Sequence, residues 1–366
     1  MIRARYLVSQ VEGDPAALAE AIAREQSLEL TRALIPQAIA DRWLGQVVRI
    51  TEQGAACHVV DIDYPTGLAS GQLGQLFHLL YGNVSYYPRV RLIDFELPAE
   101  LLDAFAGPLG GLAAIRRLVD APSRPLLMAV LKPRGSSSDT LADLAFRFAS
   151  GGGDLIKDDQ NLVETSLAIF QERITKCLKA IENAQDKIGK PCAYWPHVAG
   201  SGPCLERQLE SVARLGLPGV VMCPWVMGLE TAAAAARRHG LMWLAHPASG
   251  GSFTRPLDHG IAAPVLLGKL TRLAGADIAI VPGAGGRIVP GDPEEERLTV
   301  AALRRPWGRL PATLPALGGG QRLELAAQAG YRHGADIAVV IGGELIARGD
   351  GLERAVAATI ETLSLQ

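Results

Sequence analysis

The sequence predicts an α/β protein in which a smaller α+β domain of the ferredoxin-like type precedes a (β/α)8 TIM barrel. Eight short apolar runs recur after residue 125, helical patterns separate them, and residues 1–110 follow a different pattern. The runs are continuously apolar rather than alternating, which is typical of parallel strands buried on both faces. Eight strand-then-helix units are what a closed parallel barrel needs. We therefore assign residues 1–110 to the small domain and residues 111–366 to the barrel.

The eight predicted barrel strands begin 22 to 38 residues apart. They cover residues 126–131, 154–158, 192–198, 219–223, 241–246, 277–281, 313–317 and 336–341. After the first strand, Ser138 suits the start of a helix and Gly151 its end, because serine accepts from free backbone N–H groups and glycine tolerates the left-handed conformation. Asp292 followed by Pro293 marks another helix start.

The first 110 residues lack the regular repeat of the barrel. Strands are predicted at residues 6–8, 47–51, 58–63 and 89–95, and helices at residues 14–25 and 71–80. This mixture favours a separate α+β domain. The segment from Pro98 to Pro108 covers the junction with the barrel.

The composition excludes several classes of function. Of the 366 residues, 48% are hydrophobic and 20% charged, as in a globular protein. The net charge of −2, from 36 basic and 38 acidic residues, offers no attraction for nucleic acid or an anionic membrane. No apolar run reaches the ~18 residues that cross a bilayer, and no signal-peptide core follows Met1. The five cysteines form no CxxC pair, so we expect a cytoplasmic protein without disulfides or a zinc ribbon.

The sharpest chemical signal lies at the end of the second predicted barrel strand, where an apolar run ends in Lys157, Asp158, Asp159 and Gln160. Active sites of such barrels lie at the carboxyl ends of the strands. Strand alternation directs Lys157 and Asp159 to one face and Asp158 to the other. A lysine beside a carboxylate there can be a Schiff-base lysine, a general base or, once carbamylated, a metal ligand. The structural alternative is a lysine–aspartate ion pair.

Other predicted strand ends carry basic residues and glycines. Lys132 and Arg134 follow the first strand, while His246 ends the fifth. His246 suits an acid/base or hydroxyl-orienting role, with a structural role as the equal alternative, and Arg287 after strand six could clamp an anion. Barrels commonly bind phosphate through backbone N–H groups after strands seven and eight, although glycines there also simply make tight turns. The glycines in question are Gly318, Gly319, Gly320, Gly342 and Gly343.

Several motifs together resemble one known superfamily. Residues 152–160 are similar to the signature G-G-x-D-x-x-K-D-D-E of the RuBisCO large subunit, and residues 131–135 to its K-P-K-x-G motif. Residues 81–84 match its G-N-V segment, Glu25 lies where the family has E-S-S, and His246 lies where the family begins H-R-A-x-H. Both glycine clusters match as well. These matches follow the family's order from residue 25 to residue 343, so the chain is identified as a member of this superfamily.

The departures from the family pattern are equally informative. Gln160 replaces the metal-binding glutamate, and Arg134 replaces the second lysine of K-P-K. In the segment that matches H-R-A-x-H, Pro247 replaces the arginine and Gly250 replaces the second histidine. The loop after strand six reads Gly-Ala-Gly-Gly-Arg over residues 283–287, without the lysine that RuBisCO presents to the CO2-derived carboxylate. The chain thus resembles the RuBisCO-like (form IV) branch, which does not fix CO2.

The resemblance implies a lyase (decarboxylase) or isomerase that forms an enolate. Lys157, carbamylated by CO2, would hold Mg2+ together with Asp159 and Gln160, and the metal would stabilise the enediolate. Lys132 would transfer the proton at the carbon beside the ketone. The implied substrate is a phosphorylated ketose or oxo-sugar-acid, and the reaction is a decarboxylation, an isomerisation or a tautomerisation.

The family shares each active site between two subunits, so the resemblance also implies a homodimer in which Glu25 and Asn83 complete the partner's pocket. Two alternatives stay open. One is a metal-free enolising isomerase with unmodified Lys157, in which Arg134 or Arg287 supplies positive charge, because one carboxylate of the metal site is missing. The other is a non-catalytic homologue that binds a sugar phosphate.

Overall fold

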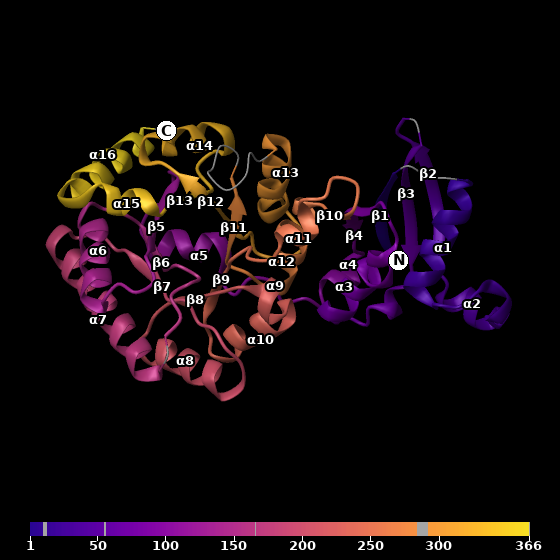
Figure 1. Cartoon of the computed structure of the whole chain (residues 1–366), viewed down its shortest axis with the longest axis horizontal. Helices are drawn as coiled ribbons and strands as arrows, with labels where there is room; N and C mark the ends of the chain where they lie inside the picture. Colours follow the sequence, from indigo (N-terminus) through magenta and orange to yellow (C-terminus); the bar gives the residue numbers. More distant parts are fainter. Residues whose placement is uncertain (10–12, 55, 165, 284–291, 366) are drawn as a thin grey trace. The chain divides into compact units, whose positions relative to one another are not determined.

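The computed structural model describes residues 1–9, 13–54, 56–164, 166–283 and 292–365 (Figure 1). The chain divides into two compact units. The small unit consists of Met1–Ala106, Ser249–Ala274 and Pro306–Leu310. The barrel unit consists of Gly107–Ala248, Gly275–Arg305 and Pro311–Gln366. Two segments from the second half of the sequence therefore belong with the N-terminal residues.

The barrel unit contains one sheet of eight parallel strands in the order β7-β6-β5-β13-β12-β11-β9-β8. A parallel bridge between His197, which follows β7, and Val221 of β8 joins the two ends of this sheet. The predicted (β/α)8 architecture is confirmed. The strands are β5 (Leu126–Leu131), β6 (Leu155–Asp158), β7 (Ala193–Trp195), β8 (Gly219–Met222), β9 (Met242–Ala245), β11 (Ile278–Pro282), β12 (Leu314–Gln321) and β13 (Ala338–Ile341).

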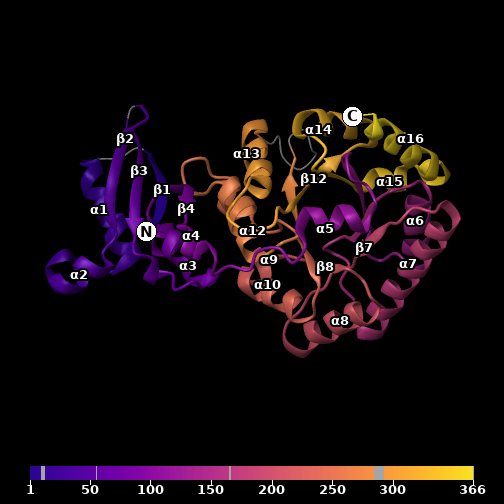
Figure 2. The same ribbon diagram turned by 180° about the vertical axis from the view of Figure 1, so that it is seen from behind.

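Helices surround these strands, as both views of the ribbon show (Figure 2). Ser137, and not Ser138, caps α6, because its hydroxyl accepts from the N–H of Thr140 at 3.1 Å. Gly151 ends α6 and Asp292 caps α13, as predicted. None of the helices in the described ranges combines the length and apolarity needed to span a bilayer. The barrel helices are α5 (Gly111–Leu118), α6 (Ser138–Ser150), α7 (Leu167–Ile188), α8 (Gly202–Arg214), α9 (Pro224–Met227), α10 (Leu229–Arg238), α13 (Pro293–Arg304), α14 (Ala326–His333), α15 (Gly343–Ala347) and α16 (Leu352–Ser364).

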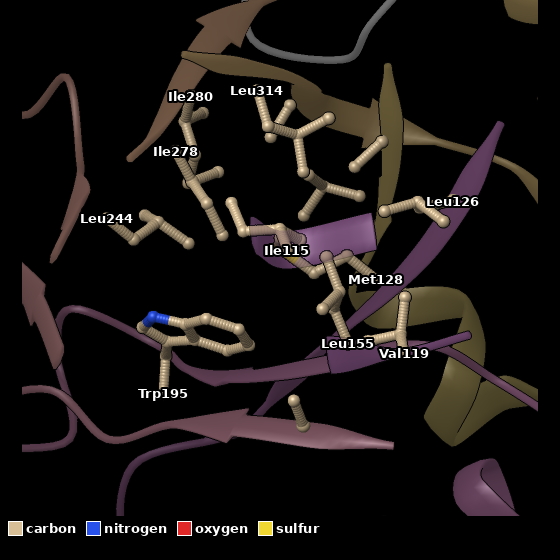
Figure 3. Close-up of a cluster of buried hydrophobic side chains, with 14 of the residues drawn as sticks. Ile115, Val119, Leu126, Met128, Leu155, Trp195, Leu244, Ile278, Ile280 and Leu314 are labelled. Carbon is tan, nitrogen blue, oxygen red and sulfur yellow. The ribbon is translucent and has the colours of Figure 1, made fainter. Parts of the chain in front are cut away.

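Apolar side chains fill the interior of the barrel (Figure 3). The strands contribute Met128, Trp195 and Ile280 to this cluster, α5 contributes Ile115, and Val119, which caps the end of α5, also belongs to it. Because the axis of the barrel is occupied by side chains, a ligand site must lie at one end of the strands.

The small unit is built on a five-stranded sheet in the order β10-β4-β1-β3-β2. The pairs are antiparallel except for β10 with β4, which is parallel. The strands are β1 (Ile2–Ser9), β2 (Gln46–Glu52), β3 (Cys57–Tyr64), β4 (Val90–Glu96) and β10 (Gly260–Ile261). The helices are α1 (Pro15–Ser27), α2 (Gln37–Trp43), α3 (Leu73–Tyr81), α4 (Ala99–Leu102), α11 (Gly251–Thr254) and α12 (Thr271–Ala274).

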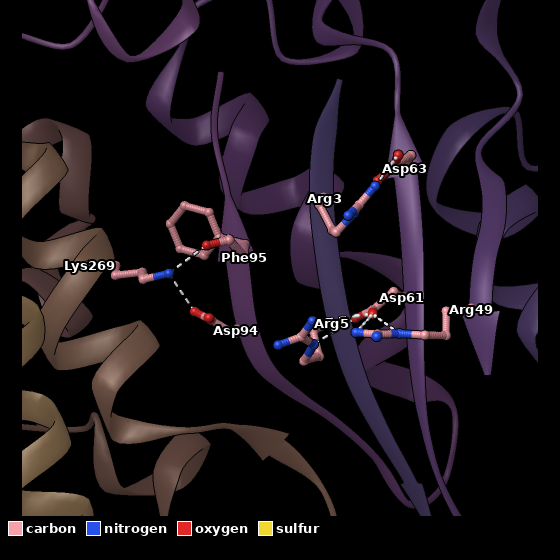
Figure 4. A network of polar contacts seen from close by, with 8 residues as sticks. All are labelled: Arg3, Arg5, Arg49, Asp61, Asp63, Asp94, Phe95 and Lys269. Carbon is pink, nitrogen blue, oxygen red and sulfur yellow. Dashed lines mark hydrogen bonds and ion pairs between the residues drawn. The ribbon is translucent and has the colours of Figure 1, made fainter. Parts of the chain in front are cut away.

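Ion pairs connect the elements of the small unit (Figure 4). Asp61 of β3 accepts from Arg5 at 2.6 Å and from Arg49 at 2.8 Å. Lys269, in the π-helical segment Pro264–Leu270, lies 2.5 Å from a carboxylate oxygen of Asp94 on β4. The Lys269 pair, together with the β10–β4 pairing, explains why residues 249–274 belong to this unit.

Asp277, directly before β11, fastens α5 to the barrel. Its Oδ1 accepts from the N–H groups of Gly110 and Gly111 at 2.8 and 2.7 Å, and its Oδ2 accepts from the N–H of Trp243 at 3.0 Å. The side chain is fully buried, so water cannot replace it as the acceptor for these three donors.

We expect Asp277→Ala to lower the free energy of unfolding by about 3 kcal/mol or more, because three N–H groups, two of them in buried hydrogen bonds, lose their acceptor. Urea unfolding followed by tryptophan fluorescence measures the difference. The matched control is Asp143→Ala, which removes an exposed i,i+4 pair with Arg147 and should cost less than about 1 kcal/mol. Equal losses in the two variants would contradict the assigned role.

Candidate active site

The predicted site residues of the barrel that the structure describes meet in one open pocket of about 700 Å3. The pocket lies at the carboxyl ends of the strands, where the filled interior ends. It is lined by Val130, Lys132, Pro133, Arg134, Lys157, Asp159, Gln160, Asn161, His246, Ile280, Gly318, Gly319, Gly320, Val340, Gly342 and Gly343.

Lys157 is a buried residue of the pocket lining. Its side chain is 1% exposed, and its Nζ donates to the backbone carbonyl of Asp158 at 2.6 Å. Burial lowers the pKa of the Lys157 ammonium to about 8. The carboxylates of Asp159 and Asp158 favour the charged form and offset part of this shift. Roughly a tenth of Lys157 is therefore the free amine at pH 7, far more than for an ordinary lysine, and the free amine is the form that reacts with CO2 or a carbonyl group.

The carboxylate of Asp158 points away from the pocket, as strand alternation predicts. It pairs with Arg173 of α7 and accepts from the hydroxyl of Tyr194 at 2.7 Å and from the N–H of His197 at 2.9 Å. The structural ion pair of this cluster is thus Asp158–Arg173 rather than a pair with Lys157. The strand position of Asp158 indicated its face, but no sequence signal identified Arg173, Tyr194 or His197 as its partners.

Asp159 supplies the sole carboxylate of the pocket lining in the part of the chain that the structure describes. Its Oδ1 accepts from the N–H of Asn161 at 2.9 Å, and its Oδ2 lies 4.0 Å from the Nζ of Lys132. Lys132 directly follows β5, lines the pocket and has a side chain that is 31% exposed. Asn161 was missed by the sequence analysis, although it directly follows the strand-end cluster.

The donor set around Lys157 fits Mg2+ once the lysine is carbamylated. Across the described ranges, no group of three or more His, Cys, Asp or Glu side chains is placed to hold a metal ion. A carbamate on Lys157 would add a second anionic oxygen ligand beside Asp159, and Gln160 would add a neutral carbonyl oxygen. Mg2+ commonly takes one or two carboxylates and keeps several waters. The described side chains are thus compatible with such a site, and both Mg2+ and the lysine carbamate stay predictions.

His246 follows β9 and is held as a neutral hydrogen-bond donor. Its Nδ1 accepts from the N–H of Ala248 at 3.2 Å, so the ring proton is on Nε2. Burial lowers the pKa of the His246 imidazole well below its usual value, and the positive charges of Lys157 and His197 add to this effect. Of the roles considered from sequence, this geometry favours orientation of a substrate hydroxyl or carbonyl over proton transfer.

The first glycine cluster lies within β12, and the second directly follows the neighbouring strand β13. Gly319 and Gly320 have φ angles of 103° and 110°, a conformation that residues with side chains rarely adopt. Gly318 accepts from the N–H of Gly283 at 2.8 Å. Arg134 is exposed and lines the same pocket. The glycines and Arg134 stay the predicted anion-binding residues.

Three predicted site residues are not among the described residues that line this pocket. Arg287 lies outside the described residues. Glu25 and Asn83 belong to the small unit, where the Nδ2 of Asn83 donates to Glu25 at 2.9 Å. The two residues that the resemblance assigns to the partner subunit are therefore in contact with each other, and their role in a shared site stays a prediction.

A family model described as ribulose bisphosphate carboxylase large chain, catalytic domain, matches residues 111–361. The chain belongs to the RuBisCO large-chain family. The ribulose bisphosphate carboxylase-like protein 1 of Rhodopseudomonas palustris is 38% identical over 362 residues, covering 98% of this chain and 96% of that protein. The resemblance to the RuBisCO-like branch is thus confirmed.

Two further comparisons support this assignment. The 5-methylthioribulose-1-phosphate isomerase of Rhodospirillum rubrum is 35% identical over 366 residues, covering 99% of this chain and 96% of that enzyme. The crystal structure of a Rubisco-like protein from Rhodopseudomonas palustris matches with a TM-score of 0.88 and 33% identity. That match covers 99% of this chain and 97% of the other.

The titration of Lys157 tests the electrostatics of the site. Trace acetylation across about pH 6–11 reports the free amine, and we expect a midpoint near the pKa of about 8 for Lys157. Asp159→Asn removes a charge that favours the ammonium form, so this midpoint should move to lower pH. The exposed Lys179 serves as the internal reference for the reagent. An unchanged or raised midpoint in Asp159→Asn would contradict the assigned electrostatics.

Gln160→Glu tests the ligand set. We expect the affinity for Mg2+ in the presence of bicarbonate to rise about tenfold or more, since even indirect changes at metal sites alter affinity by about 10–100-fold. Isothermal titration calorimetry measures the binding. Asn161→Asp adds the same charge one residue further on and is the matched control. An equal gain in both variants would indicate general electrostatic attraction, not coordination at residue 160.

Proposed function

We propose that this protein is an enolising enzyme of the RuBisCO-like branch that acts on a phosphorylated ketose or a phosphorylated oxo-sugar-acid. The observation that carries the proposal is the presence of Lys132, Lys157 and both glycine clusters in one pocket of about 700 Å3. Enolisation needs an anchor for the substrate, a group that moves a proton, and positive charge beside the developing enolate oxygen. The pocket supplies a candidate for each.

The glycine clusters anchor the phosphate. Backbone N–H groups at Gly318–Gly320 and at Gly342–Gly343 donate to its oxygens, and Arg134 adds a positive charge at the exposed side. A fixed phosphate places the ketone of the substrate over the base of the pocket. Such positioning removes much of the entropic cost of the reaction.

Lys132 moves the proton at the carbon beside the ketone. Its side chain reaches the pocket from β5, and Asp159 stands 4.0 Å away as the charged partner of the ammonium form. His246 donates its Nε2–H to a substrate oxygen and orients it.

Mg2+ would be held by carbamylated Lys157, Asp159 and Gln160. When bound, the ion would polarise the ketone and stabilise the negative charge of the enediolate. The neutral oxygen of Gln160 gives a weaker site than a glutamate would. Together with Pro247 and the absence of a lysine in residues 283–287, this replacement argues against CO2 fixation.

The names of the relatives favour isomerisation or tautomerisation as the first reaction to test, with decarboxylation of an oxo-sugar-acid as the next. Two relatives are named as a 5-methylthioribulose-1-phosphate isomerase and a putative 2,3-diketo-5-methylthiopentyl-1-phosphate enolase. We further propose that the enzyme works in the cytoplasm as a homodimer, in which the Glu25–Asn83 pair of one subunit completes the pocket of the other.

A metal-free variant of this function is the second candidate. One observation favours it: Asp159 is the lone acid among the described lining residues, and Gln160 stands where an acid is expected. Lys157 would then stay unmodified, and Arg134 or Arg287 would supply the positive charge. A stoichiometric metal in protein purified with Mg2+ and bicarbonate would exclude this candidate.

Lys132→Met and Lys157→Ala test the proposed roles. We expect each to lower kcat by about 100-fold or more, the size typical of a lost acid/base group or metal ligand. The assay uses 5-methylthioribulose 1-phosphate, 2,3-diketo-5-methylthiopentyl 1-phosphate and a phosphorylated oxo-sugar-acid. Its readouts are product formation and incorporation of solvent deuterium beside the ketone.

The control is Lys179→Met, which removes an exposed lysine of α7 and should leave kcat unchanged. Retention of kcat within a few-fold in both active-site variants would overturn the assignment of roles.

A further inference from the structure

Lys132 occupies a space that exists because residue 342 has no side chain. Gly342 directly follows β13, and Lys132 directly follows the neighbouring strand β5. A Cβ atom built on Gly342 would lie 2.7 Å from the Nζ of Lys132 and 2.8 Å from its Cε. Cβ atoms essentially never approach other heavy atoms closer than 3.0 Å, so an alanine at residue 342 and this position of Lys132 exclude each other.

The atoms with which an added Cβ would collide distinguish Gly342 from the glycines that the fold itself needs. At Gly111, for example, a Cβ would lie 2.3 Å from the backbone carbonyl oxygen of Ala312, so the barrel would have to deform. At Gly342 the collision is with the far end of a flexible side chain, and Lys132 can move away through its own torsion angles. A side chain at residue 342 would therefore displace the ammonium and leave the barrel intact.

The neighbouring glycine provides the contrast. A Cβ on Gly343 would meet no described heavy atom within 4 Å. Both glycines line the pocket and belong to the same proposed phosphate-binding cluster. Phosphate binding alone would therefore predict similar consequences for the two substitutions, whereas the geometry around Lys132 predicts different ones.

We propose that Gly342 is a positioning residue, which places the Lys132 ammonium beside Asp159 by leaving the adjoining space empty. The steric part of this inference stands on the distances alone. Its catalytic consequence rests on the proposed function, because it requires Lys132 to transfer the substrate proton. A misplacement of about 1 Å in a reacting group can lower a rate by about 100-fold.

The first experiment does not depend on any substrate. Crystal structures of wild type, Gly342→Ala and Gly343→Ala would show where the Nζ of Lys132 lies relative to Asp159. We expect the separation of 4.0 Å to be kept in Gly343→Ala and lost in Gly342→Ala, with the barrel strands superposing in all three. Lys132 in its original place in Gly342→Ala, with the backbone shifted instead, would overturn the proposal.

The second experiment separates positioning from phosphate binding by a double-mutant cycle. We expect Gly342→Ala to lower kcat by about 10–100-fold in the wild-type background and to have little further effect in Lys132→Met. An effect confined to KM, or an equal loss of kcat in both backgrounds, would contradict positioning through Lys132. If Lys132→Met alone leaves kcat unchanged, the proposed function fails, while the crystal structures still decide the steric claim.

Discussion

Burial of Lys157 at the end of β6 is the constraint on which the candidate site depends. The barrel removes water from the amine, and this burial lowers the pKa of Lys157 to about 8. The first carboxylate after it, Asp158, is bound to Arg173 and Tyr194, so Asp159 is the one that faces the pocket. A reactive amine beside a single carboxylate is the chemical starting point for a carbamate, a metal site or an unmodified cationic lysine.

The parallel barrel brings the other parts of the site to this lysine. The carboxyl ends of β5, β9, β12 and β13 carry Lys132, His246 and the glycine clusters, and all of them line one pocket. Because the strands are rigid and the barrel interior is filled, small spaces between neighbouring strand ends decide where flexible side chains lie. The space beside Gly342 is an example, since a Cβ atom there would collide with the Nζ of Lys132 in its observed position.

The sequence predicts the barrel well because each strand is a continuous apolar run and glycines mark the ends. It misplaces the cap of α6 by one residue, because serines occupy residues 136–138 and their composition cannot select among them. It also gives no sign that residues 249–274 belong with the N-terminal sheet, which depends on tertiary contacts such as the pairing of β10 with β4. Within the site, strand alternation predicts which of Lys157, Asp158 and Asp159 face the pocket. The tautomer of His246 depends on a backbone N–H in three dimensions and has no signal in the sequence.

A crystal structure of the enzyme grown with saturating Mg2+ and bicarbonate tests metal-stabilised enolisation most directly. We expect continuous density for a carbamate on the Nζ of Lys157 and a metal ion bound to the carbamate, Asp159 and Gln160. An unmodified Lys157 with no metal beside Asp159 under these conditions would contradict metal-stabilised enolisation as the central chemistry of this pocket.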